Sequence, residues 1–184
     1  MSDFGREYLV DLRAQFAKLR STAERAMAQV GDEDFARMPD AENNSIAIIV
    51  KHVSGNLRSR CTDWFTSDGE KPDRDRDGEF VLLPRDTRAH LSNEWTAAWD
   101  LLEATVEALE PGDLQRTVHI RAEPHTVCQA LNRHLGHLAY HTGQIALLAR
   151  HWVGSEWKTL SIPRGQSRAF DQAKREQRSA HRAT

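Results

Sequence analysis

Residues 126–152 read TVCQALNRHLGHLAYHTGQIALLARHW, and they form the last strongly helical stretch of the chain. Thr126 and Gln129 have the spacing of a capping box, and apolar residues then recur at helical intervals as far as Trp152. Gly154 is placed to end the helix. The stretch therefore predicts one long amphipathic helix that packs its apolar side against other helices.

Three earlier segments show the same helical spacing of apolar residues. The first begins near Leu9 and reaches Val30, where Gly31 breaks the pattern. The others run from a cap at Asn44 or Ser45 to the neighbourhood of Thr66, and from Asp86 or Thr87 to Glu110, Pro111 and Gly112. With the last helix, these segments predict an all-α fold, a four-helix bundle.

Two connections interrupt the predicted bundle. Residues 67–84 carry Gly, Pro and alternating charges, so we expect a long loop without a regular element between the second and third helices. Residues 116–121 alternate in polarity, which predicts a short hairpin, or an extended segment, before the last helix.

The chain of 184 residues, 39% of them hydrophobic, is long enough for one domain with its own core. We expect the bundle and a C-terminal strap within residues 1–167, and a polar basic tail at 168–184. In the strap, Trp157, Leu160 and Ile162 would seal the core with Arg164 in solvent, or the strap would reach a cavity mouth.

Charge and composition exclude several classes of partner. Lys and Arg number 25 against 27 Asp and Glu, so no overall field attracts nucleic acid or an anionic membrane. No apolar run is long enough to span a bilayer, and the charged N-terminus has no apolar signal region. Two cysteines cannot form a disulfide framework. We therefore expect a cytoplasmic protein without membrane or nucleic-acid partners.

Within the last helix, His137 and His141 lie four residues apart, which places both rings on one face, one turn apart. This spacing is a standard way for a helix to offer two nitrogens to one metal ion. His134 falls within the same inward arc of about 60°. His52, a polar ring in the apolar segment 45–52, is the best candidate for a third ligand.

Other readings of these residues stay open. Histidines also cap helices, stack and hydrogen-bond in protein cores. Asn56 lies near His52 on a polar fringe suited to a cavity wall. Arg60 falls in the apolar stripe, where it needs an anion or a carboxylate such as that of Asp63. It can be a structural ion pair, a snorkelling side chain or a substrate contact.

Together, these features resemble the DinB-like (YfiT-like) metalloenzyme superfamily. The resemblance covers residues 5–167 and rests on Ser45 to Asp63, with His52 inside it, and on HLAYHTGQI at 137–145. RAEPHTV at 121–127 and SIPRGQS at 161–167 resemble one uncharacterised bacterial branch of the superfamily.

The resemblance implies a four-helix bundle, often dimeric, with a divalent metal held by His52, His137 and His141. Characterised relatives include thiol-dependent transferases and isomerases that use bacillithiol, mycothiol or glutathione. His134 lies outside the ligand pattern of the superfamily, so a substitute-ligand role and a supporting role both remain open.

Three neutral imidazoles leave a metal its full charge and an open position, as in catalytic sites. Zinc, nickel and iron(II) all suit nitrogen ligands. The sequence thus favours a metal-dependent enzyme on a small-molecule substrate, either a hydrolase or an S-transferase with a low-molecular-weight thiol cosubstrate. The alternative is a non-catalytic, stress-related metal-binding protein, in which His134 would be the fourth ligand. In either case we expect a homodimer.

Overall fold

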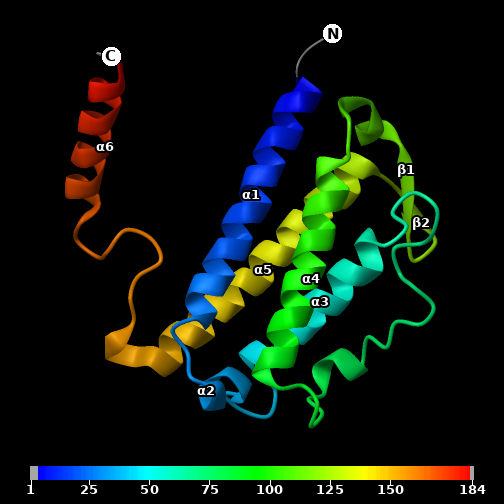
Figure 1. The fold of residues 1–184 in the computed structure, drawn as a ribbon, viewed down its shortest axis with the longest axis horizontal. Coiled ribbons are helices and arrows are strands. Elements are labelled where there is room, and N and C mark those ends of the chain that lie inside the picture. Colours follow the sequence, from blue (N-terminus) through cyan, green and yellow to red (C-terminus); the bar gives the residue numbers. More distant parts are fainter. Residues whose placement is uncertain (1–3, 183–184) are drawn as a thin grey trace.

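The structure is a computed structural model that describes residues 4–182, with the side chains of residues 4–178. The first three residues of the predicted bundle and the last two of the predicted tail therefore lie outside it. The fold is mainly helical, which confirms the all-α class (Figure 1). Its long helices are α1 (Phe4–Met27), α3 (Ile46–Cys61), α4 (Arg88–Glu107), α5 (Val127–Val153) and α6 (Ser167–Arg182).

Four of these helices enclose the core. α1 packs against α5 and α4, and α3 packs against α4 and α5, so each helix has two neighbours around a shared interior. The apolar stripes of the sequence supply that interior, and Phe16, Trp99 and Leu131 are fully buried within it. The short α2 (Asp32–Ala36) adds Phe35 to the end of the core.

A two-stranded hairpin precedes α5, as predicted. β1 (Thr117–Ile120) pairs antiparallel with β2 (Glu123–Thr126). Arg121 and Ala122 form the turn with positive φ angles of 56° and 61°. Their backbone N–H groups donate hydrogen bonds to the Asp68 carboxylate at 2.9 and 2.7 Å. This bonding fixes the turn and ties the hairpin to the long connection that follows α3.

α5 begins and ends where the sequence indicated. The N–H of Gln129 donates to Thr126 Oγ1, and the N–H of Thr126 donates to Gln129 Oε1, which confirms the capping box. Gly154 follows the helix with a φ of 60°, a conformation that glycine adopts without a steric cost. Both ends of α5 are thus well defined, and His137 and His141 lie in the interior of the helix.

Two expectations around the first long connection were wrong. The second long helix, expected to extend to Thr66, ends at Cys61, and Asp63 beyond it has a φ of 48°. The connection at 67–84 is long, as predicted, but it contains a turn of 3-10 helix, η1 (Gly78–Phe80). Two further 3-10 turns, η2 (Pro111–Gln115) and η3 (Gly154–Glu156), follow α4 and α5.

The residues after α5 first pack against the bundle and then extend away from it (Figure 1). Trp157 and Leu160 pack against the core, and the Gln29 side chain bonds the backbone N–H and C=O of Lys158. Ile162 is 37% exposed and Arg164 is exposed, so Ile162 does not seal the core as expected. α6 then stands apart from the bundle (Figure 1). No helix among the described residues is long and apolar enough to cross a membrane.

We predict that Thr126→Ala lowers the free energy of unfolding by about 1 kcal/mol, because the first turn of α5 loses its cap. Urea unfolding of the metal-free protein measures this difference. Thr96→Ala, at an exposed position inside α4, is the matched control and should be close to neutral. Equal losses in the two variants would contradict the capping role.

Candidate metal centre

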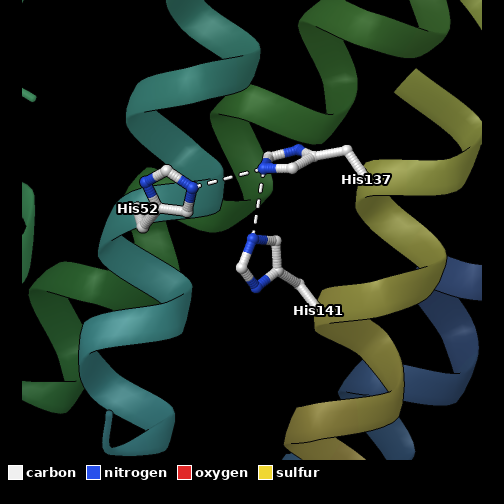
Figure 2. A group of neighbouring side chains, drawn as sticks. All are labelled: His52, His137 and His141. Carbon is white, nitrogen blue, oxygen red and sulfur yellow. Dashed lines mark hydrogen bonds between the residues drawn. The ribbon is translucent and has the colours of Figure 1, made fainter. Parts of the chain in front are cut away.

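Three histidine rings converge between α3 and α5. His52 projects from α3, and His137 and His141 project from successive turns of α5 (Figure 2). His137 Nε2 lies 3.3 Å from His52 Nε2 and 3.1 Å from His141 Nε2. His52 and His141 are buried, whereas His137 is partly exposed. The structure thus brings together the three residues that the sequence singled out.

Neighbouring acceptors determine the tautomers of two rings. His52 Nδ1 lies 2.8 Å from a carboxylate oxygen of Glu79, and His141 Nδ1 lies 2.8 Å from Gln144 Oε1. A carboxylate and an amide oxygen accept hydrogen bonds, so in each ring Nδ1 carries the proton and donates it. In the neutral rings, Nε2 is then unprotonated and directs its lone pair into the cluster, as in metal-ligating histidines.

The nitrogen spacing fits a metal ion. Two ligand nitrogens at about 2.05 Å from a tetrahedral zinc lie about 3.3 Å from each other. The observed separations of 3.1 and 3.3 Å are close to that value. A proton on His137 Nε2 can satisfy one neighbouring lone pair but not both. The donor set therefore fits a divalent ion better than a purely hydrogen-bonded cluster.

Burial keeps the α5 histidines in the form that binds metals. Burial, with the nearby His141, His52 and Arg60, lowers the pKa of His137 to about 3. Burial also lowers the pKa of His141, and its hydrogen bond to Gln144 opposes that shift only in part. Both rings are neutral at pH 7, and a neutral imidazole is the ligand that a metal requires.

Glu79, like Gln144, has a role at the site that the sequence did not indicate. It lies on η1, in the connection between α3 and α4, and its carboxylate is buried. Arg74 binds it through Nε and Nη2, both at 2.8 Å. Burial opposes ionisation of Glu79, but the hydrogen bonds from His52 and Arg74 outweigh it and lower its pKa. Glu79 is therefore a carboxylate that orients His52.

Gly55 was the available signal for this contact. It lies inside α3, where glycine costs about 1 kcal/mol relative to alanine. A Cβ at position 55 would overlap the Glu79 carboxylate. Glycine thus allows the Glu79 carboxylate to lie against the helix at this position.

A second carboxylate links this contact to the rest of the connection. Glu70 accepts hydrogen bonds from Arg74 at 3.2 Å, from Arg60 at 3.0 Å and from Arg121 at 3.2 Å. The expected Arg60–Asp63 pair was wrong, since the buried Arg60 pairs with Glu70 instead. The ionic chain runs from His52 on α3 through the connection to the turn of the hairpin.

His134 and Asn56 do not join the three rings. His134 is buried against Trp64, and neither of its ring nitrogens has a hydrogen-bond partner. Burial, with the nearby Arg60 and His137, lowers the pKa of His134 to about 3. Asn56 Oδ1 and Arg60 Nη1 are likewise buried without a partner. These polar side chains lie in the protein interior, outside the group of converging nitrogens.

Comparison with protein-family models gives one result for most of the chain. A model described as "Protein of unknown function (DUF1572)" matches residues 3–166. The matched range contains the three converging histidines and Glu79, and it ends before α6. No curated protein matches the chain.

We predict that Glu79→Gln weakens zinc binding by about 10- to 100-fold, because His52 loses the carboxylate that orients it. Gly55→Ala should weaken binding in the same direction by displacing Glu79, although alanine is the better helix former. Competition with a chromophoric chelator measures both affinities. Glu156→Gln, at an exposed site after α5, is the control. Wild-type affinity in Glu79→Gln would contradict the orienting role.

We also predict that His134 makes the metal-free protein less stable in acid. Its folded-state pKa is lowered, so between pH 7 and pH 5 the unfolded chain binds a proton there that the folded chain does not. The unfolding free energy should therefore fall by about 2 kcal/mol over this interval through His134 alone. Urea unfolding at both pH values should show a smaller fall in His134→Phe. Equal falls would contradict the assignment.

Proposed function

The chain belongs to the DUF1572 family, whose function is unknown, and we propose from its three-histidine site that it is a divalent-metal-dependent enzyme acting on a small substrate. The observation that carries this proposal is the convergence of three Nε2 atoms at the spacing of a metal-ligand set. The hydrogen bonds that fix the His52 and His141 tautomers support it.

The composition of the ligand set favours catalysis over a purely structural site. Structural zinc sites have four protein ligands, whereas catalytic sites have three and leave one position open. His137, the ring shared by both nitrogen contacts, is partly exposed, and the exposed Tyr140 lies beside His141. A substrate would reach the site from this side. The bound ion would supply Lewis acidity, which favours the deprotonated form of a coordinated water or thiol.

The reaction that we propose is thiol-dependent S-transfer or hydrolysis. The proposal of an S-transferase rests on the resemblance to the DinB-like superfamily, and it includes a low-molecular-weight thiol cosubstrate. Zinc, nickel and iron(II) are all suitable ions for three imidazoles. Within this proposal, Glu79 orients His52 and Gln144 orients His141. Burial keeps the rings of His137 and His141 neutral.

The alternative is a non-catalytic protein in which an ion only clamps α3 to α5. A fourth protein ligand would favour it, and His134 was the candidate. His134 lies outside the converging group and packs against Trp64, so it gives the alternative no support. Homodimer formation stays a prediction under both functions.

Metal analysis and an activity screen test the proposal together. We expect one zinc, nickel or iron(II) ion per chain, and a sharp loss of bound metal in His52→Ala and in His141→Ala because each removes a ligand. His151→Ala, an exposed histidine at the end of α5, should retain the ion. The loaded protein is then assayed with thiols plus an electrophile, and with simple esters.

The outcomes separate the two functions. Metal-dependent turnover that is lost in His141→Ala would support an enzyme. Full metal content without turnover in either assay would favour the clamp. Stoichiometric metal in His52→Ala would contradict the three-histidine site itself.

A further inference from the structure

A second candidate site lies on the other side of Glu79 from the histidines. A cavity of about 580 Å³ is lined by α3, by the segment 71–86 and by the start of α4. None of the three converging histidines lines it, but Arg74 and Glu79 do. The metal centre and the cavity therefore share one wall.

α3 and α4 each contribute residues to the cavity wall. α3 contributes Ser54, Gly55 and Ser59 to this side, and the Glu79 carboxylate covers Gly55. Leu91 of α4 contributes an apolar patch. The volume is within the usual range of about 300–1,000 Å³ for small-molecule sites.

Charges of both signs surround the cavity, and some are already paired. Lys51 donates to Asp86 at 2.6 Å, and Arg74 binds Glu79. Among the described residues, the exposed side chains of Arg85 and Asp73 form no hydrogen bond and no salt bridge, although the charge of Arg85 contributes to lowering the pKa of Asp86. The Lys71 ammonium group donates a hydrogen bond to the carbonyl of Asp68. Cationic and anionic groups thus both remain available at the cavity.

We propose that this cavity binds a small zwitterion of the amino-acid or short-peptide class, and that its occupancy is coupled to metal binding at the three histidines. Arg85 would receive the carboxylate, because it is an exposed cation with no hydrogen bond or salt bridge among the described residues. Asp73 would receive the ammonium group. The coupling rests on the proposed metal site, whereas the cavity does not.

The coupling follows from the shared wall. The segment 71–86 encloses the cavity, and the same segment carries Glu79 to His52 and Arg74 to Glu79. The docked segment contributes to both sites, because it orients His52 through Glu79 and forms part of the cavity wall. A ligand that favours the docked state at one site therefore favours binding at the other, and the two effects must be equal by linkage.

Calorimetric titration of the full chain with alanyl-alanine tests the site, first without metal and then with zinc. N-acetylated alanyl-alanine lacks the ammonium group, and the dipeptide amide lacks the carboxylate. We expect saturable binding of the zwitterion, with each capped peptide at least about 10-fold weaker. Arg85→Gln and Asp73→Asn should each weaken the zwitterion about 10-fold as well. Arg168→Gln, exposed on α6, is the control.

Zinc should tighten dipeptide binding by about 5-fold or more, and the dipeptide should tighten zinc binding by the same factor. In Glu79→Gln this factor should approach one, because the link to His52 is weakened. No saturable binding, equal binding of the capped peptides, or unchanged affinity in Arg85→Gln would overturn the cavity assignment. Dipeptide binding that ignores bound zinc would overturn the coupling. Dipeptide binding in a chain that retains no metal would overturn the proposed function and leave the cavity assignment supported.

Discussion

The hydrogen bond from His52 Nδ1 to Glu79 is the contact on which the site depends. It fixes the tautomer of His52, and it holds η1 against α3. Glycine at position 55 allows this contact, because a Cβ there would overlap the carboxylate. Arg74 then neutralises Glu79, so that the buried carboxylate beside His52 does not remain an uncompensated charge. The His52–Glu79 contact therefore fixes the His52 tautomer, the packing of η1 on α3 and the pairing of Glu79 with Arg74.

The polar residues next to the site include buried atoms that lack a hydrogen-bond partner. His134, Asn56 and Arg60 each bury a polar atom without a partner, and such an atom costs about 1–3 kcal/mol. The surrounding core of leucine, isoleucine and tryptophan side chains from four helices can offset costs of this size, since each fully buried large side chain contributes about 1.5–3 kcal/mol. Ionisable groups are consequently held in a site of low polarity, where burial lowers the pKa of His134 and His137.

Helical features could be predicted from the sequence because they are local. The capping box at Thr126, the glycine after α5 and the spacing of His137 and His141 all act within one or two turns. His52 was found because a polar ring in an apolar segment is conspicuous. Glu79 was missed because its role depends on a tertiary contact, and in sequence it is one acid among many in a charged loop. Arg60 was given the wrong partner for the same reason, since Glu70 reaches it only after the connection folds back over α3.

X-ray absorption spectroscopy at the zinc edge, on the zinc-loaded protein, tests most directly whether His52, His137 and His141 bind the metal. The structure predicts three imidazole nitrogens and one further light ligand at about 2.0–2.1 Å, with the multiple-scattering pattern of histidine. In His52→Ala the zinc-edge signal should fall together with the bound zinc, because one ligand is removed. A first shell without imidazole, or one with thiolate at about 2.3 Å, would contradict a metal centre built from His52, His137 and His141.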